Sequence, residues 1–226
     1  MYWEEEKALE PPVVGNEVVD LQFAMDCRAL PVDHAWALSQ ALQAELSWLS
    51  DEPAVGIHSI HGAATGNGWV RPEDPNALLQ LSRRTRLILR LPGHRVEEAR
   101  GLEGKTLSVA GQPLALKQAT PRTLSTQTTL FSRHLATEEA FVNEEQLLDW
   151  VAGRLAALDI RPRKLLCGTS HDIHTPQGDI VTRSLMIADL EYDEAIRLQQ
   201  AGIGPHRLLG CGLFIPHKGI QSLSSY

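Results

Sequence analysis

The chain is short of several features that mark whole classes of protein. No apolar run in its 226 residues approaches the roughly 18–20 residues that a membrane-spanning helix needs. The N-terminus begins Met-Tyr-Trp-Glu-Glu-Glu, and an acidic start is unlike a signal or transit peptide. The only cysteines are Cys27, Cys167 and Cys211, an odd number without paired spacing. We therefore expect a cytoplasmic protein in a reducing environment, with no membrane partner and no structural zinc.

Positive charge is also scarce, because 21 lysines and arginines face 28 acidic residues and the net charge is −7. This balance counts against nucleic-acid binding, but its distribution weakens the objection. Residues 1–60 hold eleven acidic and two basic residues, whereas the remainder holds 17 acidic and 19 basic residues. Residues 81–95 contain five arginines and no acid. A phosphate backbone interacts mainly with nearby positive charge, since salt screens electrostatic interactions beyond about 8–10 Å. The alternative is that these arginines only solvate the outer face of a strand.

The pattern of apolar residues predicts an α+β protein. After a loose acidic arm over residues 1–16, strands are expected at 18–25, 55–60, 85–91 and 107–116. Helices are expected at 35–49, with Asp33 as the N-cap, and at 95–102. Residues 121–126 then form a linker. The second half repeats the order, with strands at 128–135, 164–170, 180–190 and around Phe214, and helices at 143–158 and 192–201. Two consecutive βαββαβ units indicate two ferredoxin-like (RRM-like) modules, at 17–120 and 127–226.

A glycine-rich segment follows the last predicted helix. It reads Gly202-Ile-Gly204-Pro-His206-Arg207-Leu-Leu-Gly210-Cys-Gly212, a G-x-G-x5-G-x-G arrangement. This spacing matches neither the Walker loop nor the dinucleotide-binding motif. Glycines tolerate positive φ and admit a close ligand, so bare N–H groups in such a loop favour binding of a phosphate. The alternative is two tight turns beside a strand.

This segment resembles the glycine-rich loop of the Cas-six (Cas6) family of CRISPR repeat-cleaving endoribonucleases. Other segments agree, among them Val18–Phe23, Leu30–Leu38 and Gly56–Gly62, and together they look like the myxan-type branch of that family. The resemblance runs from about Val18 to Gly219. It implies that the partner is CRISPR repeat RNA and that the chain cleaves it without a metal or other cofactor. It also allows the enzyme to stay on the 3′ stem of its product and to join other subunits in an effector complex.

The reaction that the resemblance implies uses the 2′-OH of the RNA as nucleophile and leaves a 2′,3′-cyclic phosphate. Histidine suits the transfer of the protons because its pKa lies near the working pH. In the family the catalytic histidine generally lies in the first module, where His34, His58 and His61 are the candidates. We rank His58 first, His34 second and His61 third. On a strand, His58 and His61 would point to opposite faces, unless the strand ends between them. His34, at a helix start, has the alternative role of packing or capping.

Two sets of residues are candidates for holding the RNA. The first is the glycine-rich loop, with Gly202, Gly204, Gly210 and Gly212 opening the backbone and with His206 and Arg207 directed at phosphates. The second is Arg83, Arg84 and Arg86, since arginine forks match phosphates. The pair His171 and His174 is a weak metal signal without a third ligand, so no metal site is predicted. The chain departs from the family in lacking a tyrosine in its first helix.

Two other functions remain open from the sequence. A catalytically inactive RNA-binding subunit of an effector complex would share the fold and the loop, and would bind the repeat without cutting it. A ferredoxin-like scaffold for protein or a small molecule would show no salt-dependent affinity for RNA.

Overall fold

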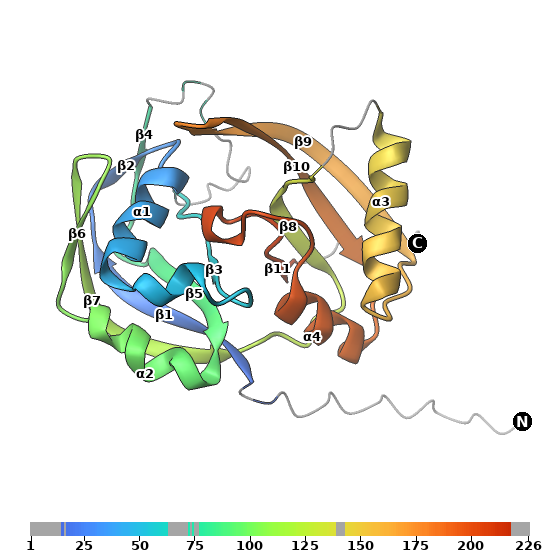
Figure 1. Ribbon diagram of the computed structural model, residues 1–226, viewed down its shortest axis with the longest axis horizontal. Coiled ribbons are helices and arrows are strands. Elements are labelled where there is room, and N and C mark those ends of the chain that lie inside the picture. The colour runs from blue at the N-terminus through green and yellow to red at the C-terminus, as the bar shows by residue number, and fades with distance from the viewer. Residues whose placement is uncertain are drawn as a thin grey trace, which may run out of the picture.

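The computed structural model describes residues 17–62, 77–138 and 143–217, together with residues 15, 72 and 74 (Figure 1). Apart from Gly15, the acidic arm predicted over residues 1–16 lies outside the described residues. The predicted α+β class is confirmed: within the described residues, four α-helices accompany three sheets in which every neighbouring pair of strands is antiparallel. None of the described helices is long and apolar enough to cross a membrane.

The first half is built around a five-stranded sheet in the order β3-β5-β1-β7-β6. Its strands alternate apolar and polar residues, so one face carries the core (Leu21, Phe23 and Leu89 among others) and α1 covers it. The elements of this half are β1 (Val18–Asp26), β2 (Ala29–Pro31), α1 (Ala35–Glu45), η1 (Ser47–Ser50), β3 (Gly56–Ile57), β4 (Leu78–Gln80), β5 (Arg86–Pro92), η2 (Gly93–Arg95), α2 (Val96–Ala99), η3 (Arg100–Leu102), β6 (Thr106–Val109) and β7 (Gln112–Thr123). Strands β2 and β4 form a separate small sheet.

The second half is a four-stranded sheet in the order β11-β8-β10-β9, with a second core against α3 and α4. Its elements are β8 (Leu130–Leu135), α3 (Glu144–Ala157), β9 (Lys164–Thr175), β10 (Gly178–Ala188), α4 (Tyr192–Ala201), η4 (Arg207–Leu209) and β11 (Ile215–Pro216). Asn143 starts α3 by accepting the N–H of Gln146 at 2.9 Å. Gly202, with φ of 66°, ends α4 as the sequence predicted.

Several local predictions are wrong. The strand predicted over 107–116 is two strands, β6 and β7, and β7 continues to Thr123 into the predicted linker. The strand predicted over 55–60 ends at Ile57, and irregular backbone follows. The N-cap of α1 is His34 rather than Asp33, whose carboxylate instead accepts the N–H of His174 at 3.1 Å. His171 and His174 lie on β9, which extends to Thr175 and is longer than the strand predicted over 164–170.

The segment between α4 and β11, which contains the glycine-rich loop, lies between the two halves. Figure 1 shows it beside α1 on one side and β8 on the other. The chain therefore brings residues from both halves together at this loop.

Candidate active site

The short segment from His58 to His61, here called the histidine segment, is fixed at both ends. The N–H of His58 donates to the carbonyl of Ile88 on β5 at 3.0 Å. The N–H of Ile60 donates to Nε2 of His34 at 3.2 Å. The strand ends at Ile57, so the side chains after it no longer alternate between two faces. His58 and His61 therefore do not have to point in opposite directions.

His34 anchors this segment through its imidazole. An amide N–H can only donate, so Nε2 of His34 is the acceptor for Ile60. Nδ1 therefore carries the proton and donates to the carbonyl of Pro31 at 2.8 Å. The side chain is buried, 3% exposed, at the start of α1. This arrangement supports the packing role of His34, with both ring nitrogens on backbone groups.

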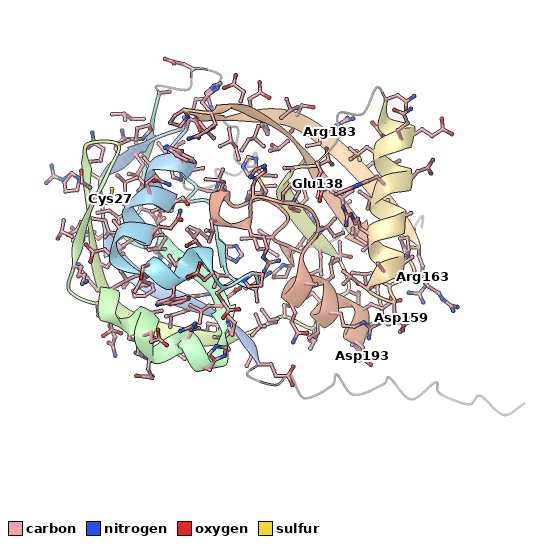
Figure 2. The ribbon with its side chains drawn as sticks, in the orientation of Figure 1. Cys27, Glu138, Asp159, Arg163, Arg183 and Asp193 are labelled. Atoms are coloured by element: carbon pink, nitrogen blue, oxygen red, sulfur yellow. The ribbon has the colours of Figure 1, made fainter. Side chains whose placement is uncertain are left out.

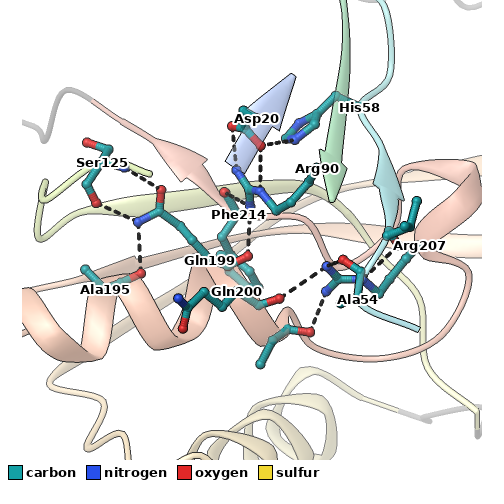
Figure 3. A network of polar contacts seen from close by, with 12 residues as sticks. Asp20, Ala54, His58, Arg90, Ser125, Ala195, Gln199, Gln200, Arg207 and Phe214 are labelled. Carbon is teal, nitrogen blue, oxygen red and sulfur yellow. Dashed lines mark hydrogen bonds and ion pairs between the residues drawn. The ribbon is translucent and has the colours of Figure 1, made fainter. Parts of the chain in front are cut away.

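His58 points to a carboxylate. Its Nε2 lies 3.5 Å from Oδ1 of Asp20 on β1, at the long limit of a hydrogen bond (Figure 3). Asp20 is itself held by the guanidinium of Arg90, whose Nε and Nη2 donate at 2.8 and 2.9 Å. Burial alone raises the pKa of the Asp20 carboxyl, but the close imidazole of His58 and the hydrogen bonds from Arg90 outweigh burial and hold this pKa below its usual range. Burial also lowers the pKa of His58, against the contact with Asp20, so the imidazole is neutral at physiological pH.

His61 faces a small cavity where the two halves meet. The cavity is lined from the first half by His34, Ser59 and His61, and from the second half by His134 and Ile173. Burial, and then the positive charge of Arg133, lowers the pKa of His61 to about 2. His134 belongs to the second half, yet the fold brings it beside His34 and His61. Its Nδ1 donates to Thr182 at 3.1 Å, since that hydroxyl gives its own proton to the carbonyl of His171.

The glycine-rich loop, Gly202–Gly212, packs directly on the histidine segment. A Cβ at Gly210 would lie 2.5 Å from Oγ of Ser59 and 3.2 Å from the carbonyl oxygen of Ile57. Cβ atoms at Gly204 and Gly212 would overlap the carbonyl oxygens of Ala136 and Ile203. All four glycines have positive φ. They are therefore needed for close approach of backbone to backbone.

Backbone hydrogen bonds hold the glycine-rich loop in its conformation. Four backbone N–H groups donate to carbonyls within the loop, those of Ile203, Leu209, Gly210 and Cys211. The N–H of Gly212 donates to the carbonyl of His134 at 2.7 Å. The expectation of a string of bare N–H groups is therefore wrong for these amides.

Arg207 is directed inward, contrary to the expectation that it would reach for phosphates. Its guanidinium donates to Val55 and Ala54 of the first half, at 3.2 and 2.9 Å, and to Gln200 and Ala201 at the end of α4. Arg90 does the reverse: from the first half, its Nη1 donates to the carbonyls of Gln199 at 3.0 Å and Phe214 at 2.8 Å (Figure 3). Each half therefore contributes one arginine whose guanidinium donates hydrogen bonds to backbone carbonyls of the other half.

An open groove of about 370 Å³ runs between α1 and the loop. Trp36, Ser39 and Gln43 line one wall, and Pro205 and His206 line the other. The Nε2 of Gln43 donates to Oγ of Ser39 at 2.8 Å. His206 is exposed, so of the two loop side chains predicted to meet RNA it is the one that faces solvent.

Arg83 and Arg84 are exposed in the turn before β5, and Arg86, also exposed, is the first residue of β5. The guanidinium of Arg86 donates to the carbonyls of Arg83 and Thr85 at 3.0 and 2.9 Å. The structure does not bring them to the glycine-rich loop. The sequence analysis missed Asp20, Arg133 and His134, and it counted Arg90 only within a basic run. No local signal marks these residues, because their partners are distant in the chain.

The depressed pKa values predict acid-sensitive stability. The pKa values of His58 and His61 in the folded state lie below the value of about 6.5 in the unfolded chain, so the unfolded state binds more protons below pH 6.5. The contribution of each histidine to the free energy of unfolding is therefore fully present above pH 6.5. Below pH 6.5 the free energy of unfolding falls by up to about 1.4 kcal/mol per pH unit for each histidine. The pKa of Asp20 is also lowered, but its effect is confined to pH values below about 4.

Melting temperatures measured at pH 7.5, 6.5 and 5.5 test this prediction. We expect little change between the first two values and a clear drop at the third, reduced in His61→Gln. The matched control is His174→Gln, because Asp179 raises the pKa of that exposed histidine and its contribution has the opposite sign. An equal drop in His61→Gln and the unaltered protein contradicts the assignment.

Comparison with known proteins places the chain in a family. A family model described as Cas6 Crispr matches residues 19–219. The CRISPR-associated endonuclease Cas6 of Myxococcus xanthus (strain DK1622) is 29% identical over 198 residues, which cover 88% of this chain and 81% of that protein.

Solved structures support the fold. A structure titled CRISPR associated protein Cas6 matches with a TM-score of 0.60 at 10% identity, covering 89% of this chain and 100% of the other. A Cas6-related protein from Pyrococcus furiosus matches with a TM-score of 0.61 at 11% identity, over 87% and 97% of the two chains. The CRISPR endoribonuclease Cse3 bound to a 19-nt RNA matches with a TM-score of 0.52 at 12% identity, over 88% and 98%. With a family model spanning nearly all of its described residues, the chain belongs to the Cas6 family of CRISPR-associated proteins.

Proposed function

We propose that this protein is a metal-independent endoribonuclease that cleaves CRISPR precursor RNA within its repeats, by attack of the 2′-OH on the adjacent phosphate. The observation that carries the proposal is the histidine segment, held between His34, Asp20 and the glycine-rich loop in a chain of the Cas6 family. Two similar proteins support it by name: one is a CRISPR-associated endonuclease, and another is an endoribonuclease with RNA bound.

His58 is the proposed proton-transfer group. A neutral imidazole is the form that accepts a proton from the 2′-OH, and burial keeps His58 neutral. Asp20 is the proposed positioning residue, because a carboxylate on one ring nitrogen fixes the orientation of the ring and stabilises the imidazolium that forms. Arrival of the RNA brings phosphate charge close to the ring, which raises its pKa toward the working range.

Arg133 is the proposed source of positive charge for the transition state. Its Nε is buried and has no hydrogen-bond partner among the described residues, and burial lowers the pKa of its guanidinium. The guanidinium also lies over the ring of Phe131, 5.8 Å from the centroid. A cation whose buried N–H lacks a partner is suited to the negative charge that develops on the phosphate during attack.

The groove between α1 and the glycine-rich loop is the proposed RNA path. His206 and the backbone of Gly204 line its loop wall. Gly202, Gly210, Gly212 and Arg207 act indirectly in this proposal, because their contacts hold the loop in place. The proposed framework is two ferredoxin-like modules, at 17–120 and 127–226. It is supported by the element order βαββαβ of the described residues in each half, apart from the additional strands of the first.

The test is incubation of the purified protein with RNA carrying the CRISPR repeat of its host, in EDTA, followed by analysis of the new ends. We expect a single cut that leaves a 2′,3′-cyclic phosphate and a 5′-hydroxyl. A tight complex without a cut overturns the catalytic proposal in favour of an inactive RNA-binding subunit. Absence of salt-dependent RNA affinity overturns both and leaves a protein scaffold.

A further inference from the structure

A second recess lies in the first half of the molecule, away from the glycine-rich loop. It holds about 540 Å³ and is formed where β1 ends and where the turn before β5 begins, with Cys27, Arg28, Ser82 and Arg83 in its wall. Figure 2 shows Cys27 at the edge of the molecule opposite to Asp159, Arg163 and Asp193 of the second half. The volume lies within the range of about 300–1,000 Å³ that is usual for ligand sites.

The charge of this recess is strongly one-sided. Four cationic side chains line it, and the only carboxylate in its wall is Asp26; the cations are Arg28, Arg83, Arg86 and Lys117. All four are exposed. The nearest opposite-charge contact joins Nζ of Lys117 to Asp26 at 3.9 Å, and exposed pairs of this kind contribute little. On a chain of net charge −7, the recess is therefore a local positive surface.

The turn that carries two of these arginines is ordered by its own hydrogen bonds. Nη1 of Arg86 donates to the carbonyls of Arg83 and Thr85, and the N–H of Arg84 donates to Oγ of Ser82 at 3.2 Å. These contacts use one nitrogen of the Arg86 guanidinium and none of the Arg83 side chain. These hydrogen bonds order the backbone that carries the cations, so less conformational entropy is lost when an anion binds.

The position of the recess relates it to the histidine segment. On the paired strands β1 and β5, Asp20 faces Arg90 and Ala24 faces Arg86. Four residues of antiparallel strand span about 14 Å. Arg86 therefore lies roughly 14 Å along the same sheet from the carboxylate that His58 contacts.

We propose that this recess binds the phosphate backbone of the substrate RNA, at a stretch of the strand beyond the one that lies in the groove. The inference rests on the proposed function and adds a second contact to it. Several spaced cations, of which Lys117 alone has an ion pair to a carboxylate among the described residues, suit a run of phosphates, and guanidinium forks match phosphate oxygens. Since the recess lies away from the histidine segment, it contributes to affinity and leaves the chemical step alone.

The neighbouring arginines provide a matched comparison. Arg83 lines the recess and Arg84 does not, although both are exposed and adjacent in the same turn. Affinity for repeat RNA is measured over a range of salt concentrations for Arg83→Ala, Lys117→Ala, their double variant and Arg84→Ala. For the double variant we expect about tenfold weaker binding and a salt slope smaller by about 1.4, which is 0.7 per single-strand phosphate contact. For Arg84→Ala, whose side chain lies outside the recess, we expect no change in slope.

Each outcome decides the proposal. Equal effects of Arg83→Ala and Arg84→Ala overturn it, because only the general field of the turn then matters. An unchanged salt slope in the double variant also overturns it, while binding and cutting by the unaltered protein leave the proposed function intact. Absence of RNA binding by the unaltered protein overturns both. Circular dichroism and melting temperatures confirm that the variants fold.

Discussion

Replacing His58 by alanine is expected to slow cleavage of repeat RNA by about 10²–10⁴-fold, the usual contribution of a group that transfers a proton. The structure places Nε2 of His58 3.5 Å from the carboxylate of Asp20. RNA affinity should stay close to that of the unaltered protein, since His58 is largely enclosed, with 12% of its side chain exposed. Single-turnover cleavage at saturating RNA measures the first quantity, and a filter-binding titration measures the second.

Two further variants separate chemistry from packing. Asp20→Asn keeps the shape of the side chain but removes its charge, so it should shift the acid limb of the pH–rate profile as well as lower the rate. A purely structural Asp20 would lower the melting temperature without moving that limb. Full cleavage by His58→Ala contradicts the assignment and transfers the role to His34, with His61 next. For His34→Ala we expect a lower melting temperature in any case, because the anchor for Ile60 is lost.

Replacing Gly212 by alanine should destabilise the protein by about 2–5 kcal/mol, combining left-handed backbone strain with overpacking. Gly212 has φ of 66°, and an added Cβ would overlap the carbonyl of Ile203 within the same loop. A shift of this backbone also breaks the bond from the Gly212 N–H to His134. RNA binding should fall together with stability, because the loop wall of the groove is displaced. Chemical denaturation and RNA titration measure the two effects.

The chain supplies its own controls for this effect. Gly104 has φ of 80° but nothing within 4 Å of an added Cβ, so Gly104→Ala should show the strain alone, about 1–2 kcal/mol. Gly210→Ala meets mainly Oγ of Ser59, so the double variant with Ser59→Ala should recover part of the loss. If Gly104→Ala and Gly212→Ala lower the free energy of unfolding by the same amount, the close contact between Gly212 and the carbonyl of Ile203 does not contribute to the loss.

Local sequence signals predicted much of the fold. Helix α4 begins and ends at the predicted residues because both ends carry their own signals: a capping box of Glu191 and Glu194 at the start, and Gly202 at the end. Helix α3 likewise follows from Asn143. The strand after Val55 was predicted too long, because its end depends on a hydrogen bond to His34, more than twenty positions away. Apolar periodicity carries no information about such a contact.

The candidate site was only partly predictable for the same reason. The histidines and the glycine-rich loop are visible as residue types and spacings, so they were found. Asp20 and Arg90 occupy outward positions of alternating strands, where a charged residue ordinarily faces solvent. Only the packing of the second half on that face turns them into buried partners, as the complete burial of Arg90 shows. Arg207 was misjudged because a cation in a glycine-rich loop looks the same whether it meets a phosphate or carbonyls.

The exchange of arginines between the halves also bears on how the chain is made. Arg90 and the carbonyl of Phe214 are separated by 124 positions in the sequence. A ribosome that adds about 5–20 residues per second reaches the second partner about 6–25 s after the first. During that interval, among the described residues of the first half, the guanidinium of Arg90 has its hydrogen bonds to Asp20 but lacks those to the second half. Synthesis of residues 199–214 supplies the carbonyls that Arg90 needs, so the candidate active site is completed late in translation.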